Sequence, residues 1–70
     1  MLKYRYRIVV SGRLGPMSRE AFADFKIEPN ATNTVLVAEL DQSALYGALN
    51  RIQSLGLELI EFVRLEDDRP

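Results

Sequence analysis

The stretch "TVLVAELDQSALYGALNRIQSLGLELIEFVRL" (residues 34–65) decides the fold, because two strand-like segments flank one amphipathic segment. Residues 34–40 alternate between two sets of mainly apolar side chains, a pattern typical of a strand. In residues 42–55 the apolar positions recur at i, i+3, i+4 and i+7, which predicts one buried helix face. That face comprises Leu45, Ala48, Leu49, Ile52 and Leu55. Residues 57–65 favour a second strand, so the stretch predicts strand, helix and strand.

The ends of this helix carry their own signals. Asp41 directly precedes it, and a carboxylate there can accept a hydrogen bond from a free backbone N–H of the first turn. Gly56 directly follows the helix, at a position where the backbone commonly adopts the left-handed conformation that glycine favours. We therefore expect the main helix to run over about 42–55.

The N-terminal segment "LKYRYRIVVS" (residues 2–11) alternates with period two from Lys3 onward. Basic side chains and a valine occupy one face of the predicted strand, while tyrosines and aliphatic residues occupy the other. We expect the second set to pack beneath the main helix. That set comprises Tyr4, Tyr6, Ile8 and Val10.

The segment between these strands is less regular. "PMSREAF" (residues 16–22) predicts a helix of one or two turns, with Ser18 as its cap. "FADFKIE" (residues 22–28) predicts a charged edge strand that carries Phe25 and Ile27 on one face. "PNATN" (residues 29–33) predicts a turn.

The predicted order is strand, short helix, strand, strand, helix, strand. It indicates an α+β fold of the ferredoxin-like βαββαβ type, with a very short first helix. Right-handed crossovers place the first and third strands at the centre of a four-stranded antiparallel sheet, with the main helix on one face. Residues 1–70 form a single predicted domain, with residues 66–70 as a frayed acidic tail.

The amino-acid composition argues against several classes of function. The chain has no Cys and no His, which argues against disulfides, the usual zinc and copper sites, and the commonest catalytic bases and nucleophiles. We therefore expect no metal, no cofactor and no enzymatic activity. The net charge of −1 argues against a dedicated nucleic-acid binder. No apolar run approaches the length of a membrane span or a signal peptide, so we expect a cytoplasmic protein.

Residues 34–64 resemble a group of short, uncharacterised bacterial proteins that share the pattern "DQ-x-AL-x-G-x-L-x-RI-x-x-LGLEL". The matching positions are Asp41, Gln42, Ala44, Leu45, Gly47, Leu49, Arg51, Ile52, Leu55, Gly56, Leu57, Glu58 and Leu59. The resemblance implies no known activity. More distantly, the strand–helix–strand is similar to half of an ACT-type ligand-sensing domain, although only "SGRLG" (residues 11–15) comes near the glycine-rich loop of that family.

The face of the sheet opposite the helices is predicted to mix charged and aliphatic side chains. Opposite charges on neighbouring strands form an ionic lattice that explains the basic run without a ligand. Five aliphatic residues on the same face predict a patch larger than a monomer usually exposes. The predicted interaction surface comprises Arg5, Arg7, Val9, Val35, Val37, Glu39, Glu61 and Val63; Leu65 completes the aliphatic set.

A chain of 70 residues has a marginal core, which favours a partner chain as the stabilising element. We expect a homodimer, joined face to face or edge to edge with two-fold symmetry, that acts through protein contacts as an accessory or regulatory subunit. A monomer with a charged, partly apolar open face is the alternative state, and another protein is an alternative partner.

Two other functions remain open. The first is an anion or amino-acid sensor with a ligand loop at Gly12, Arg13, Gly15 and Ser18, where backbone N–H groups could meet an anion. The second is a nucleic-acid binder that uses Lys3, Arg5, Arg7 and Arg13.

Overall fold

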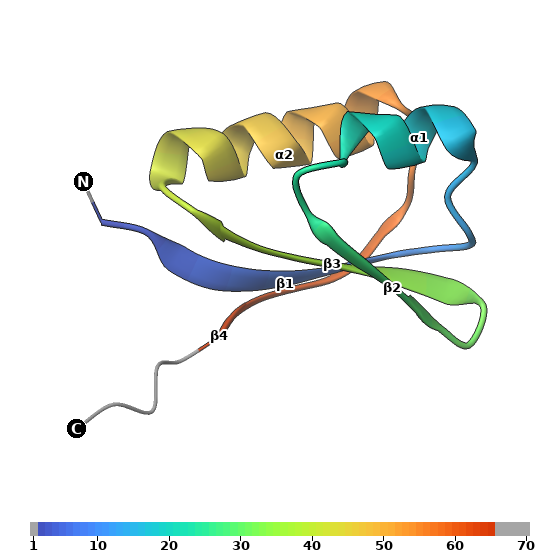
Figure 1. Cartoon of the computed structure of the whole chain (residues 1–70), viewed down its shortest axis with the longest axis horizontal. Helices are drawn as coiled ribbons and strands as arrows, with labels where there is room; N and C mark the ends of the chain where they lie inside the picture. Colours follow the sequence, from blue (N-terminus) through green and yellow to red (C-terminus); the bar gives the residue numbers. More distant parts are fainter. Residues whose placement is uncertain (1, 66–70) are drawn as a thin grey trace.

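The chain folds as a four-stranded antiparallel sheet covered on one face by two helices (Figure 1). The computed structural model describes residues 2–65, so the expected tail at 66–70 lies outside the described residues. The elements are β1 (Tyr4–Val10), α1 (Pro16–Ala21), β2 (Lys26–Asn30), β3 (Asn33–Leu40), α2 (Gln42–Ser54) and β4 (Leu59–Leu65). The predicted α+β fold class is confirmed.

The strands lie in the order β2-β3-β1-β4, which fits the ferredoxin-like pattern and puts β1 and β3 at the centre. Tyr6 lies opposite Ala38 on β3, and Arg7 lies opposite Val37. The ladder between β1 and β4 shifts its register between Val9 and Val10. The two edges of the sheet are therefore β2 and β4.

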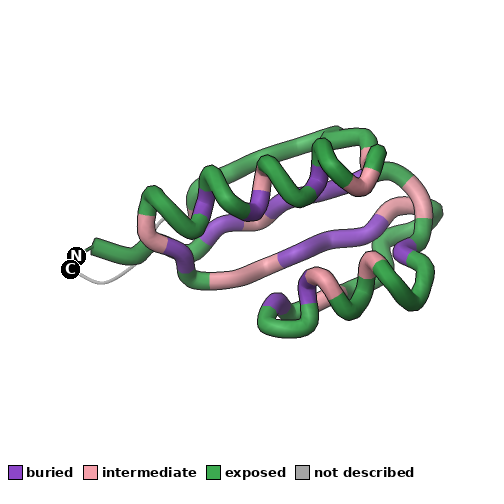
Figure 2. Tube along the Cα trace, turned by 90° about the horizontal axis from the view of Figure 1, so that it is seen from above, coloured by how far each residue is buried: buried purple, intermediate pink, exposed green. Residues whose placement is uncertain are grey.

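The hydrophobic core lies between the sheet and the two helices, which run side by side over one face (Figure 2). Its largest fully buried side chains are Ile8 and Val10 from β1, Leu36 from β3, and Phe22 just after α1. The even-numbered residues from Tyr6 to Val10 on β1 and from Leu36 to Leu40 on β3 belong to this core or pack against it, as the alternation predicts.

The main helix has the predicted face, with Leu49 and Leu55 half-buried at its margin, and it ends one residue earlier than predicted, at Ser54. Leu45, Ala48 and Ile52 are buried. The backbone N–H of Ala44 donates a 2.7 Å hydrogen bond to Oδ1 of Asp41, which satisfies one free donor of the first turn. Gly56 has a φ of +72°, a left-handed conformation that only glycine adopts at little cost.

Removing this N-cap should weaken the fold measurably. We expect Asp41→Ala to lose about 1 kcal/mol of unfolding free energy. For a domain of this size the melting temperature should fall by about 4–8 °C. Asp41→Asn keeps an acceptor oxygen and should stay close to the wild type in thermal denaturation followed by circular dichroism. An equal loss in both variants would contradict the capping role.

The first helix begins earlier than predicted, and Ser18 does not cap it. Gly15 is the N-cap residue, and Pro16 follows at the first helical position, where its fixed φ and missing N–H suit the helix.

Arg51 of α2 connects the main helix to the C-terminal end of α1. Its Nη1 donates a 2.6 Å hydrogen bond to the carbonyl oxygen of Ala21, and its guanidinium carbon lies 5.5 Å from the centre of the Phe22 ring.

The prediction for residues 22–33 is partly wrong. Residues 22–25 form a turn after α1, although Phe25 is buried in the core, and β2 begins at Lys26. Pro29 and Asn30 belong to β2, which leaves only residues 31 and 32 in the turn. An edge strand tolerates proline because its missing N–H can face away from the sheet.

Candidate functional site

The edge strand β4 is the most exposed apolar element of the described chain. Every residue from Leu59 to Arg64 is exposed, although β1 pairs with this strand along one side. Phe62 rests on Tyr6, with ring centres 5.5 Å apart and nearly parallel planes. Among the strands of residues 2–65, none lies on the other side of β4, so its backbone N–H and C=O groups on that side can pair with another chain.

The tyrosines of β1 differ in their surroundings. Tyr6 is buried beneath α2, as predicted. Tyr4 is 38% exposed, so the prediction that it packs beneath the helix is wrong. It lies opposite Leu40, the last residue of β3, where the chain leaves the sheet to begin α2. The guanidinium carbon of Arg64 instead lies 4.2 Å from the centre of the Tyr4 ring.

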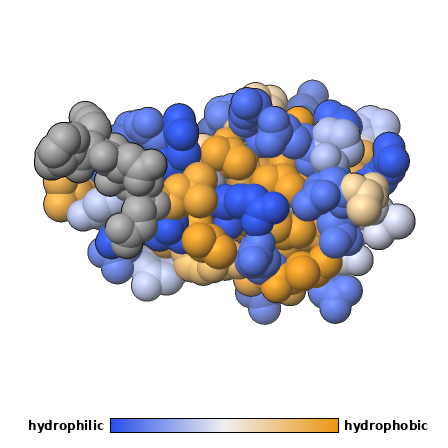
Figure 3. Space-filling model, turned by 90° about the horizontal axis from the view of Figure 1, so that it is seen from below, coloured by the Kyte–Doolittle hydropathy of each residue, from blue (hydrophilic) through white to orange (hydrophobic). Residues whose placement is uncertain are grey.

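The face opposite the helices carries charged and aliphatic side chains together (Figure 3). Nη1 of Arg7 on β1 donates to Oε1 of Glu61 on β4. Arg5 lies opposite Glu39 in the ladder between β1 and β3. These neighbours agree with the predicted ionic lattice.

The aliphatic part of this face is less exposed than its composition suggests. Val9 and Val35 lie opposite each other and are only 4% and 5% exposed. Val37 and Leu65 are half-buried, which leaves Val63 as the exposed member of the set at 38%. Neighbouring side chains of the same sheet therefore shield most of the aliphatic surface that the sequence places there.

The predicted ligand loop lies beyond the C-terminal end of β1. Gly12 has a φ of +80°, and its carbonyl oxygen accepts a 2.7 Å hydrogen bond from Oγ1 of Thr34. The N–H of Ser11 donates to the carbonyl oxygen of Glu58 at 2.9 Å. Gly15 caps α1 and Ser18 lies inside it, while Arg13 is exposed. The loop thus tethers β1 to β3 and to the start of β4.

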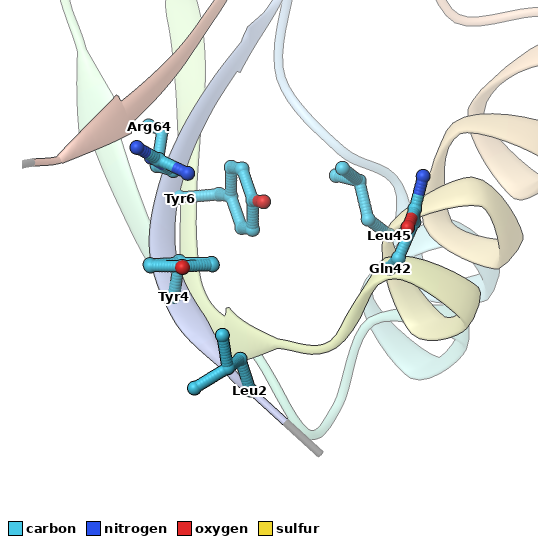
Figure 4. Close-up of a pocket in the computed structure, with 6 residues that line it drawn as sticks. All are labelled: Leu2, Tyr4, Tyr6, Gln42, Leu45 and Arg64. Atoms are coloured by element: carbon cyan, nitrogen blue, oxygen red, sulfur yellow. The ribbon is translucent and has the colours of Figure 1, made fainter.

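A pocket of about 480 Å³ lies at the other end of β1 (Figure 4). Three separate segments form it: the N-terminal residues, the start of α2 and the end of β4. Figure 4 shows the Tyr6 hydroxyl directed from β1 toward α2, where Leu45 and Gln42 lie. The pocket lining comprises Leu2, Tyr4, Tyr6, Gln42, Leu45 and Arg64.

Sequence reasoning selected neither the apolar edge nor the pocket. The odd residues Glu61 and Val63 share a face with Arg7, as predicted. The sequence does not distinguish Ile60 and Phe62, because "LELIEFVRL" has apolar residues at both odd and even positions. This pattern is typical of a strand that is buried on both faces. The signal that could have identified an edge was the predicted strand order itself, since the fourth strand has only one neighbour.

Within residues 2–65, neither helix combines the length and the apolar character that crossing a bilayer demands. In the same part of the chain, no three Asp or Glu side chains are grouped closely enough to hold a metal ion.

Comparison with known proteins identifies the family. No curated protein and no solved structure matches the chain. A family model described as "Domain of unknown function (DUF8691)" matches residues 5–63, from the second residue of β1 into β4. The match spans the sheet, both helices and the connections between them, and it confirms the expectation of an uncharacterised family. The chain therefore belongs to the DUF8691 family of domains of unknown function.

Proposed function

We propose that this protein is a small, non-enzymatic module that self-associates through β4 and acts through protein contacts as an accessory or regulatory subunit. The observation that carries the proposal is the apolar, unpaired edge of β4. Its exposed large hydrophobic residues are Leu59 at 45%, Ile60 at 50%, Phe62 at 40% and Val63 at 38%. An exposed edge of this kind is a template for pairing with another strand.

The opposite edge of the sheet offers a contrast within the same molecule. The strand β2 has only five residues and includes Pro29. Lys26 and Glu28 form an exposed ion pair of 3.5 Å on it. Short length, proline and charge are the features with which proteins protect an edge from pairing. These features are present on β2, whereas β4 lacks proline and is longer and more apolar, which favours β4 as the contact edge.

A second copy of the chain fits this edge. Antiparallel pairing of β4 with its own copy about a two-fold axis is self-complementary. If the axis passes near Phe62, then Glu61 lies opposite Val63 of the partner subunit and Phe62 lies opposite its own copy. Within Leu59–Leu65 no like charges are then directly opposed, and aromatic rings meet across the interface. Burial of the four apolar side chains on each subunit supplies the driving force.

Edge pairing has more support than stacking of the open faces. Face-to-face stacking would draw on the predicted surface around Val9, Val35 and Val37, but the first two are already covered within one chain. Val63 belongs to both surfaces. Nucleic-acid binding has less support again, because Arg7 is paired with Glu61 and Arg5 lies opposite Glu39.

Sedimentation velocity and light scattering across a concentration series test the proposal. We expect a mass of twice 8.0 kDa at concentrations of about 100 µM, with dissociation on dilution to about 1 µM or below. Because the contact is mainly apolar, high salt should leave the dissociation constant nearly unchanged. A monomer at all concentrations would contradict the proposal, and a dimer that dissociates in high salt would point to an electrostatic contact instead.

The alternative function of a small-ligand sensor is supported by the distant likeness to ACT-type domains and by one observation, the pocket at the start of β1. This pocket is not at the loop of residues 11–18, which follows the opposite end of the strand.

A further inference from the structure

We propose that the pocket lined by Tyr4, Tyr6 and Arg64 binds a small carboxylate that has an apolar body. This inference does not depend on self-association. The pocket has a volume of about 480 Å³, which falls in the range of small-molecule sites. Such sites combine apolar walls with a few convergent polar groups. Leu2 and Leu45 supply apolar wall, and the tyrosine rings supply flat surfaces for an aromatic or aliphatic body.

The hydroxyl of Tyr6 is the first group that points to a ligand. The side chain belongs to a residue only 8% exposed, yet its hydroxyl forms no hydrogen bond within residues 2–65. No fully buried side-chain oxygen or nitrogen in that part of the chain is left unsatisfied, so this hydroxyl reaches the open space of the pocket. Because the hydroxyl is open to solvent, water can bond to it in the free protein, and a ligand oxygen in the pocket can take the place of that water.

Arg64 is the second such group. It lies directly opposite Tyr6 in the ladder between β1 and β4, and its guanidinium lies over the Tyr4 ring. Stacking uses the face of the guanidinium and leaves its N–H groups free to bind a carboxylate in the plane. Within the described chain Arg64 forms no ion pair. The structure thus holds a cationic fork in a pocket that polar and apolar side chains line together.

The charge balance favours a carboxylate over a phosphate. One guanidinium neutralises one negative charge, and the other polar side chains of the lining, Gln42 and the two tyrosines, are neutral donors. The start of α2 adds little attraction for an anion, because the carboxylate of Asp41 already occupies it through the bond to Ala44. Arg64 therefore provides the recognition of charge, and Tyr6 and Gln42 provide further hydrogen bonds.

Titration of the ¹⁵N-labelled full chain with sodium phenylacetate, followed by amide chemical shifts, tests this inference. We expect saturable shifts at Gln42, Leu45 and Arg64 with a dissociation constant of about 1 mM, as befits so small a ligand. The neutral phenylacetamide should bind at least tenfold more weakly. Arg64→Gln should weaken phenylacetate binding about tenfold, since it removes a charged hydrogen-bond donor. Tyr6→Phe should weaken it severalfold.

Arg5→Gln is the matched control, because it removes the same charge from the opposite face of the sheet and should leave binding unchanged. Equal binding of phenylacetate and phenylacetamide, or unchanged binding by Arg64→Gln, would overturn the inference. So would shifts that do not saturate, or saturable shifts at Gly12–Ser18 instead of the pocket. The substitutions Ile60→Glu and Val63→Glu lie outside the lining, so a chain made monomeric by them should still bind; the two proposals can therefore fail separately.

Discussion

The double substitution Ile60→Glu and Val63→Glu is expected to convert the protein to a monomer. Both side chains are exposed on the β4 edge, so their replacement removes little from the core of one chain. Burial of a half-exposed Ile or Val in an interface stabilises it by about 1 kcal/mol. Two residues on each of two subunits contribute about 4 kcal/mol. The new charge at position 60 faces Arg64 of the partner subunit and the one at position 63 faces Glu61 of the partner subunit, so the attraction and the repulsion roughly cancel. The dissociation constant should therefore rise by about 1000-fold. Sedimentation velocity measures this change directly.

The monomer should remain folded. Val63 lies opposite Arg7 in the ladder, so a glutamate at this position gains a favourable neighbour within its own chain. Met17→Glu together with Tyr46→Glu is the matched control, because it adds the same charge at two exposed apolar positions on the helices. We expect this control to dimerise like the wild type. Equal loss of self-association in both double variants would show that net charge matters and that the β4 edge does not.

The second large effect concerns the core. Phe22 is completely buried, packs edge-to-face on Phe25 at 5.2 Å between ring centres, and lies beneath the Arg51 guanidinium. Replacement of such a residue by alanine costs about 3–5 kcal/mol. A chain of this length has roughly 4–10 kcal/mol of stability in total. We therefore expect Phe22→Ala to lower the melting temperature by about 15 °C or more, or to unfold the chain at room temperature.

Met17→Ala provides the comparison for Phe22→Ala, because Met17 is a large apolar residue that is 78% exposed. Its melting temperature should stay within about 2 °C of the wild type, as for most surface substitutions. Thermal denaturation followed by circular dichroism measures both variants. A Phe22→Ala variant as stable as the wild type would mean that the junction of α1, β2 and α2 does not hold the fold together.

The parts of the fold that the sequence predicts best are those that local chemistry determines. The apolar spacing of Leu45, Ala48 and Ile52, the cap at Asp41 and the left-handed Gly56 all follow from helix geometry. The alternation along β1 predicts its two faces for the same reason. Strand order then follows from the handedness of the crossovers.

The errors occur where two local signals compete. Pro16 and Ser18 both suggest a helix start, and the proline prevails because its fixed φ suits the first helical position. Pro29 and Asn30 resemble turn residues, yet the edge of the sheet accommodates them. Tyr4 follows the correct alternation but lies at the end of the sheet, where α2 begins.

The two candidate sites depend on packing between distant segments, which a single sequence does not encode locally. Phe62 is exposed because it lies on an edge strand, although the composition of β4 resembles that of a buried strand. Arg64 stacks on Tyr4 across two strands, and Gln42 lines the same pocket from α2, so the pocket needs three segments that are distant in sequence. Equally, the shielding of Val9 and Val35 depends on neighbouring strands, so the sequence overstates the apolar surface of the open face.

The contact edge itself can be observed by an isotope-filtered nuclear Overhauser experiment on a mixture of ¹³C,¹⁵N-labelled and unlabelled chains. Only contacts between subunits give signals in this experiment. The account predicts contacts between residues 59–65 of one subunit and the same residues of the other, centred near Phe62. Contacts confined to β2, or confined to the open face around Val37, would contradict it, as would the absence of any contact between subunits.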